Sequence, residues 1–134
     1  MNYFVIATHS TYAEGLYNAI KFFKNDCDNV RYINAYVEDQ EFEKCFRNTI
    51  EDIKQENLII FTDMAGGSVN QVVTNISREY DYKIVTGVNL PLLLELLFNP
   101  NDLTIEDLRN SVENAKEQLM VIEEFKDDES SDEL

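Results

Sequence analysis

Short apolar runs alternate with amphipathic stretches along most of the chain. The runs with the length and composition of buried strands cover residues 3–8, 30–37, 57–62 and 82–87. Apolar residues at helical spacing predict helices over residues 12–23, 42–53, 69–80, 90–98 and 105–122. The last of these stretches ends ambiguously, because residues 119–125 fit either a helix or an additional C-terminal edge strand.

This alternation predicts the fold class. Strands and helices that alternate at this spacing indicate βαβ units and a mainly parallel sheet. Right-handed crossovers place helices on both faces. We therefore expect an α/β, doubly wound fold with a four-stranded, mainly parallel sheet in the order 2-1-3-4. Sites in such sheets form beyond the carboxyl ends of the strands where the winding reverses, here between the first and third strands.

His9 is the only histidine of the chain, and it directly follows the first predicted strand. A lone histidine is more often a surface or packing residue, but this one stands at the predicted site and just before a helix. Thr11 and Glu14 have the spacing of a capping box, and Ser10 is an alternative cap. The first-turn amides of that helix carry partial positive charge, so they would attract an anion held next to His9.

Asp63 directly follows the third predicted strand, so the fold would bring it beside His9. Its carboxylate would fix one ring nitrogen and leave the other as a nucleophile, unless Asp63 only caps the next helix. Gly66, Gly67 and Ser68 come next, before a predicted helix. Adjacent glycines let the backbone approach a ligand closely, and a serine there caps the helix or donates to phosphate oxygens. A Gly-Gly-Ser turn alone is a common loop.

Length and charge narrow the functional classes. The 134 residues fit one domain, for which we predict residues 1–126, followed by a disordered acidic tail over residues 127–134. A net charge of −15 argues against nucleic acid as a partner.

Cys27 and Cys45 lack the spacing of a zinc site, and we expect neither a metal nor a cofactor. Without a signal-peptide pattern or a membrane-length apolar run, we expect a cytoplasmic location.

Motifs of several other site classes are missing from the sequence. It has no GxxxxGK[ST], no GxGxxG after the first strand and no GxSxG. A response-regulator receiver shares the predicted architecture and also uses an aspartate after the third strand. It needs acidic residues at the end of the first strand, however, where this chain has Ala7, Thr8 and His9.

Three blocks of the sequence carry a family resemblance: ATHSTYAEGL (7–16), IIFTDMAGGSVNQV (59–72) and VTGVNLPLLLELL (85–97). They resemble the enzyme IIA component of the mannose-type (mannose/fructose/sorbose) phosphoenolpyruvate-dependent sugar phosphotransferase system. The resemblance implies that His9 accepts a phosphoryl group from the phosphocarrier HPr. It also implies that His9 passes the group to a IIB component, which phosphorylates a sugar entering through a membrane IIC/IID complex.

The resemblance also implies roles for the other residues. It makes His9 and Asp63 the catalytic pair, with Asp63 orienting the ring, and it places Ser68 at the phosphate. The predicted phosphate-binding residues are Ser68, the two glycines that precede it, Gly66 and Gly67, and Ser10, which follows His9. The family is homodimeric with an exchanged C-terminal strand, for which residues 119–125 are the candidate.

The sequence departs from the family pattern at Ser10, Ala65 and Val69, where a glycine, a bulky aromatic and a proline are usual. These departures concern the partner surface and the sugar more than the chemistry. Transfer between two histidines is nearly thermoneutral and needs positioning rather than a metal. Two alternatives share the fold: a phosphotransfer subunit of dihydroxyacetone kinase and a regulatory module that transfers nothing. Residues 66–70 and 87–91 favour the mannose type over the kinase subunit.

Overall fold

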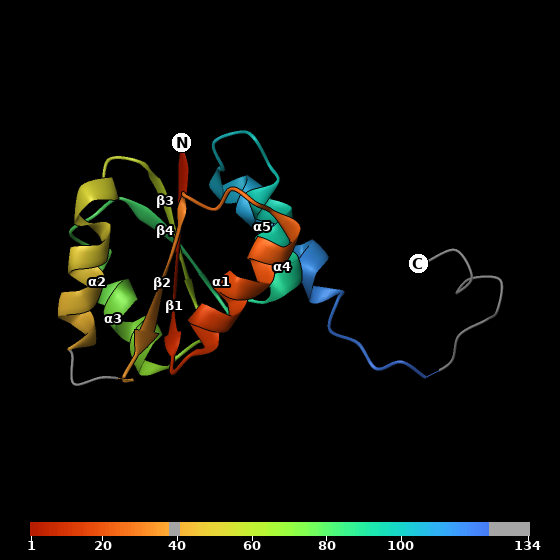
Figure 1. Cartoon of the computed structure of the whole chain (residues 1–134), viewed down its shortest axis with the longest axis horizontal. Helices are drawn as coiled ribbons and strands as arrows, with labels where there is room; N and C mark the ends of the chain where they lie inside the picture. The colour runs from red at the N-terminus through yellow and green to blue at the C-terminus, as the bar shows by residue number, and fades with distance from the viewer. Residues whose placement is uncertain (38–40, 124–134) are drawn as a thin grey trace.

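A parallel sheet separates two layers of helices (Figure 1). The computed structural model describes residues 1–37 and 41–123. Its strands are β1 (Asn2–His9), β2 (Val30–Ala35), β3 (Asn57–Thr62) and β4 (Tyr82–Thr86). They form a four-stranded sheet in the order β2-β1-β3-β4 and pair in parallel throughout. The predicted fold class and strand order are confirmed.

The helices cover both faces of this sheet. They are α1 (Tyr12–Phe23), α2 (Phe42–Ile50) with the short 3₁₀ turn η1 (Glu51–Ile53), α3 (Ser68–Ile76), α4 (Leu90–Leu97) and α5 (Ile105–Lys116). Figure 1 shows α2 and α3 on one face and α1, α4 and α5 on the other. This is the arrangement that right-handed βαβ crossovers produce.

The central strand β1 contributes side chains to both layers. Phe4 and Ile6 pack into the cluster formed with α1, α4 and α5, while Val5 and Ala7 pack with α2 and α3. Because both faces of the strand are covered, its sequence is continuously apolar rather than alternating. His9 is the residue at which β1 ends and reaches the surface.

Helix α4 is almost entirely apolar, and its burial explains why. Leu92, Leu93 and Leu96 lie in the core, where the helix contacts α1 and α5. Asn89 caps it by accepting a hydrogen bond from the Leu92 amide at 2.9 Å. None of the helices in the described ranges is long and apolar enough to span a membrane.

Helix α5 is shorter than the sequence pattern predicts. It begins with a capping box between Thr104 and Asp107 and ends at Lys116. The prediction of a helix to residue 122 is therefore wrong. The apolar residues that suggested it, Leu119 and Ile122, are 89% and 58% exposed. Side chains that stay this exposed gain little from burial, so the apolar period does not maintain a helix.

The segment after α5 leaves the domain (Figure 1). Residues 117–123 form neither a helix nor a strand, so the predicted edge strand is absent from this described part of the chain. Residues 124 and 125 lie outside the described residues, as do the predicted domain boundary at residue 126 and the acidic tail.

Candidate functional site

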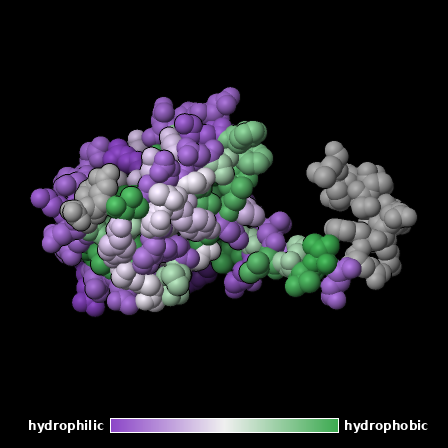
Figure 2. Space-filling model, turned by 60° about the horizontal axis from the view of Figure 1, so that its bottom comes forward, coloured by the Kyte–Doolittle hydropathy of each residue, from purple (hydrophilic) through white to green (hydrophobic). Residues whose placement is uncertain are grey.

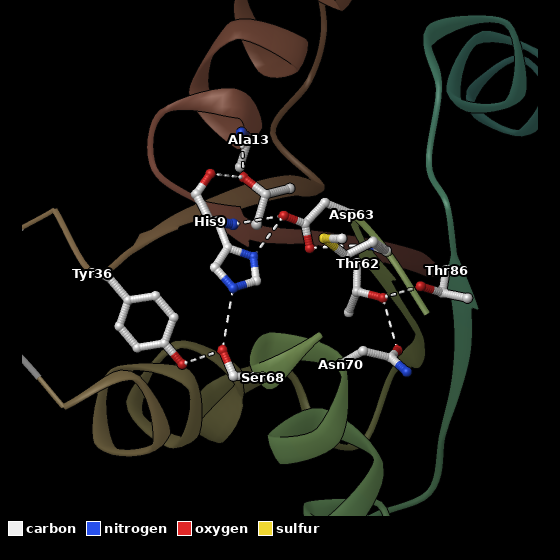
Figure 3. A network of polar contacts seen from close by, with 10 residues as sticks. His9, Ala13, Tyr36, Thr62, Asp63, Ser68, Asn70 and Thr86 are labelled. Carbon is white, nitrogen blue, oxygen red and sulfur yellow. Dashed lines mark hydrogen bonds and ion pairs between the residues drawn. The ribbon is translucent and has the colours of Figure 1, made fainter. Parts of the chain in front are cut away.

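The carboxyl ends of β1 and β3 meet at the predicted reversal point of the sheet (Figure 3). His9 is the last residue of β1, and Asp63 directly follows β3. The two strands are neighbours, with Ala7 paired to Thr62, so both side chains come to the same edge. The side chain of His9 is 38% exposed and that of Asp63 only 13%.

Asp63 contacts both the main chain and the ring of His9. Its Oδ2 accepts a hydrogen bond from the backbone amide of His9 at 2.9 Å and lies 2.8 Å from Nδ1. Since an ionised carboxylate can only accept, the neutral ring carries its proton on Nδ1 and a lone pair on Nε2. Asp63 does not cap the next helix, because Gly67 is the N-cap of α3.

Hydrogen bonds keep the Asp63 carboxyl ionised. Burial alone would raise the pKa of this carboxyl. The hydrogen bonds from the amide and the ring of His9 together lower the pKa by more than burial raises it. The resulting pKa of Asp63 lies below its ordinary value. A negative charge therefore lies against Nδ1 at neutral pH, where it would balance a positive charge on the imidazole.

Ser68 and Tyr36 lie on the other side of the imidazole (Figure 3). Nε2 of His9 is 3.1 Å from the hydroxyl oxygen of Ser68, which is the first residue of α3. The hydroxyl of Tyr36 donates to that same oxygen at 3.0 Å, and its ring centroid is 5.4 Å from the His9 ring. The structure therefore brings together His9, Asp63 and Ser68, and it adds a tyrosine that the sequence analysis did not select.

Each of the two glycines before Ser68 suits its position for a different structural reason. Gly66 has a φ of +78°, a left-handed conformation that disfavours any side chain. A Cβ on Gly67 would lie 3.3 Å from Cε1 of His9 and 2.9 Å from Cγ of Met64. Gly67 thus allows the loop to approach the imidazole closely, because a side chain here would have to displace Met64 and the imidazole.

Ser10 lies beside the site but outside its hydrogen-bond network. Its backbone has a φ of +56°, and its amide donates to the carbonyl of Ala35 at 2.9 Å. The hydrogen bonds that connect Asp63, His9, Ser68 and Tyr36 do not include the Ser10 hydroxyl. The assignment of Ser10 to the phosphate site stays a prediction.

The predicted capping box at the start of α1 is wrong. Thr11 is the N-cap residue but makes no side-chain capping bond. The buried Thr8 hydroxyl accepts from the Ala13 amide at 2.7 Å instead, and the side-chain oxygen of Asn34 accepts from the Glu14 amide at 3.2 Å. Because Thr8 and Asn34 already accept from the amides of Ala13 and Glu14, these two amides are not available to the anion that the sequence predicts there.

A second polar cluster, which the sequence analysis also missed, fixes the start of α3. The buried hydroxyl of Thr62 lies 2.8 Å from Oδ1 of Asn70 and 2.8 Å from the hydroxyl of Thr86 (Figure 3). These contacts connect β3, α3 and β4 at one point. They hold the first turn of α3, and with it Ser68, against the end of the sheet.

Side chains that could hold a metal ion do not gather in the part of the chain that the structure describes. Over residues 1–37 and 41–123, no group of three His, Cys, Asp or Glu side chains is placed to hold an ion. The donor set at the site itself consists of one imidazole, one carboxylate and two hydroxyls.

Comparison with known proteins decides the family. The EIIA-man family, described as PTS system fructose IIA component, matches residues 3–113. The chain belongs to this family. The match includes all three sequence blocks that suggested the mannose-type enzyme IIA, so that resemblance is confirmed.

Individual relatives agree with this membership. The PTS system fructose-specific EIIA component of Bacillus subtilis (strain 168) is 30% identical over 81 residues, which span 59% of this chain and 56% of that protein. The PTS IIA protein associated with the fucose utilization operon of Streptococcus pneumoniae is 30% identical, with a TM-score of 0.77 over 90% of this chain and 93% of that one. The mannose/sorbose specific IIA subunit of Enterococcus faecalis shares the fold, with a TM-score of 0.83 at 14% identity over 93% of this chain and 97% of that one.

Membership of the EIIA-man family makes one sequence departure intelligible. The family usually has glycine after the histidine, and this chain has Ser10. The φ of +56° at that position is the conformation that glycine adopts most easily. The usual glycine thus matches a backbone requirement that Ser10 meets at an energetic cost.

Proposed function

We propose that this IIA component is a phosphocarrier that accepts a phosphoryl group from HPr on Nε2 of His9 and passes it to a IIB component. The observation that carries the proposal is the asymmetry of the imidazole. Its Nδ1 lies against the buried carboxylate of Asp63, and its Nε2 lies at the half-exposed edge beside the hydroxyl of Ser68. A ring in this state has one nitrogen with a nucleophilic lone pair, Nε2, at the side that a partner can reach.

The transfer step follows from this asymmetry. The lone pair of Nε2 attacks the phosphorus of phosphohistidine on HPr, and the phosphorus–nitrogen bond of the donor breaks. The electron pair of that bond returns to the donor ring, while Nδ1 of His9 keeps its proton. The positive charge that develops on the His9 ring is stabilised by Asp63. Transfer to a IIB component repeats these events with His9 as the donor.

The equatorial oxygens of the moving phosphoryl group need hydrogen-bond donors. Ser68 offers a hydroxyl at 3.1 Å from Nε2, and it is also the first residue of α3. The amino end of a helix carries partial positive charge and favours an anion. Gly66 and Gly67 let this helix start approach the ring, which supports their assignment to the phosphate site.

The partners define where the protein acts. Exchange with HPr and IIB, and through IIB with the membrane IIC/IID complex, would take place in the cytoplasm. The sugar phosphorylated at the end of this relay would be selected by those membrane components. No nucleic acid is among the expected partners, in keeping with the net charge of −15.

We also propose that the protein is a homodimer that exchanges its C-terminal segment. β4 is an edge strand, and a groove of about 680 Å³ lies between it and α5, with Ile84 and Leu108 in its wall. Figure 2 shows apolar atoms along the segment that leaves the domain after α5, where Leu119 and Val121 are 89% and 84% exposed. An exposed apolar segment could cover the edge of β4 that no other strand pairs with among the described residues.

Reconstitution tests the phosphocarrier proposal. The protein is incubated with labelled phosphoenolpyruvate, enzyme I and HPr, and acid-labile phosphate is measured. We expect wild type to be labelled, His9→Ala to remain unlabelled, and the label to pass to a IIB domain. Normal labelling of His9→Ala would contradict the proposal, as would a wild-type protein that HPr never labels. Transfer only to a dihydroxyacetone kinase would support the kinase-subunit alternative.

A further inference from the structure

We propose that Tyr36 is a positioning residue that directs the hydroxyl of Ser68 at the phosphoryl acceptor nitrogen and then at the phosphoryl group. The inference rests on the proposed function of His9 as the phosphoryl carrier. It concerns a residue outside the three sequence blocks that carry the family resemblance. The hydrogen bond from Tyr36 to Ser68, at 3.0 Å, is the contact from which it starts.

The hydrogen bonds around the imidazole have one consistent direction. Asp63 accepts from Nδ1, so Nε2 has a lone pair and must itself accept. Ser68 has a single proton, and at 3.1 Å from Nε2 that proton completes the contact. The Ser68 oxygen is then the acceptor for the Tyr36 hydroxyl, which has a proton to give. The donation from Tyr36 therefore favours the one rotamer of the Ser68 proton that points at Nε2.

Phosphorylation of Nε2 changes the acceptor, and the Ser68 hydroxyl must move aside to make room for the phosphorus. The new nitrogen–phosphorus bond uses the lone pair that Ser68 binds in the free protein. The Ser68 proton must then turn to another acceptor, and the phosphoryl oxygens are adjacent because Nε2 lies 3.1 Å from the serine oxygen. As long as Tyr36 donates to Ser68, the serine cannot turn its own proton toward the tyrosine. Its donor capacity remains available to the phosphoryl group.

The backbone conformation of Tyr36 directs its side chain to the site. Its φ of +66° is left-handed, which is costly for a bulky residue. β2 ends one residue earlier, at Ala35, and the left-handed turn directs the phenol toward Ser68 (Figure 3). The ring also packs near Phe42, with 6.3 Å between centroids, and yet is 54% exposed. The residue is thus held at the rim of the site rather than in the core.

The test compares Tyr36→Phe with Tyr32→Phe, which changes a tyrosine of β2 whose ring packs on Tyr17. Both variants are labelled by HPr and enzyme I, each also in a Ser68→Ala background. We expect Tyr36→Phe to slow phosphorylation of His9 about five- to tenfold, the typical effect of one hydrogen bond. In the Ser68→Ala background the same change has no further effect, because Tyr36 acts through Ser68. Tyr32→Phe is expected to match wild type.

A second readout does not depend on phosphate transfer. In the unphosphorylated protein, the ¹⁵N resonance of Nε2 reports whether this nitrogen accepts a hydrogen bond. We expect Tyr36→Phe to move it downfield, in the direction of the larger change caused by Ser68→Ala. An unchanged resonance together with an unchanged rate would overturn the inference, and so would effects of the two substitutions that add independently. A wild type that takes no phosphate from HPr would refute the proposed function instead, and the resonance would still decide the role of Tyr36.

Discussion

One carboxylate oxygen of Asp63 holds His9 at two points, with the backbone amide at 2.9 Å and the ring nitrogen Nδ1 at 2.8 Å. The first contact fixes the end of β1, and the second fixes the tautomer and rotation of the imidazole. Because both contacts use the same atom, the ring has little freedom relative to the sheet. This rigidity directs Nε2 toward Ser68 and the partner surface.

Replacement of Asp63 by asparagine removes the negative charge beside His9 and keeps the shape of the side chain. The amide oxygen of Asp63→Asn can still accept from the backbone, but it no longer balances a positive ring. We expect phosphorylation of His9 to slow about ten- to hundredfold, as for the loss of one charged hydrogen bond, with native circular dichroism retained. The control is Asp52→Asn, which breaks a surface ion pair with Arg31. A variant that loses its native fold would show that Asp63 acts mainly in stability.

The lowered pKa of Asp63 makes the same pair sensitive to acid. A carboxyl whose folded pKa lies below its unfolded value, near 3.9, stabilises the fold fully above that value. The contribution is lost as pH falls through the folded pKa. Urea denaturation of wild type and Asp63→Asn should therefore give a difference in the free energy of unfolding that is present at about pH 5 and narrows below about pH 4. A difference that widens below about pH 4 would contradict the lowered pKa.

Gly67 tests how closely the loop approaches the ring. In Gly67→Ala the new methyl group would meet Cε1 of His9 at 3.3 Å and the side chain of Met64 at 2.9 Å. Since Met64 is flexible and 55% exposed, we expect a loss of stability of only about 1 kcal/mol. The displaced imidazole should slow phosphorylation at least tenfold. Gly15→Ala is the control, because a Cβ added at residue 15 meets nothing within 4 Å. This variant should retain the full rate of His9 phosphorylation.

Ser10 tests the backbone requirement next to His9. At a φ of +56°, Ser10→Gly should raise the free energy of unfolding by about 1 kcal/mol, measured in urea. Ser10→Ala keeps the Cβ and should give no such gain. If Ser10→Ala also slows phosphorylation of His9, the serine hydroxyl contributes to the phosphate site as the sequence analysis predicted.

Much of the fold follows from local sequence patterns. The apolar runs define the strands because β1 and β3 are buried on both faces, and the strand order places their ends together at His9 and Asp63. The meeting of these two side chains was therefore predictable. So was the start of α3 after Gly66 and Gly67, since glycine-rich turns before helices are a local signal.

The missed features depend on contacts between distant parts of the chain. Thr8 and Asn34 replace the expected capping of α1 because the fold brings a buried hydroxyl and the neighbouring strand to its amides. The apolar run of residues 30–37 predicts a strand through Tyr36, since no sequence period reveals that the backbone turns left-handed after Ala35. The end of α5 at Lys116 has a similar cause, because the apolar residues that follow it are mostly exposed and gain little from burial.

The position of the phosphate on His9 tests the central claim most directly. The protein phosphorylated by phosphoenolpyruvate, enzyme I and HPr is examined by ³¹P NMR, which distinguishes phosphate on Nε2 from phosphate on Nδ1. Because Asp63 lies 2.8 Å from Nδ1, the account predicts a single phosphohistidine signal from Nε2, which disappears in His9→Ala and when a IIB domain is added. Phosphate on Nδ1, or on any residue other than His9, would contradict it.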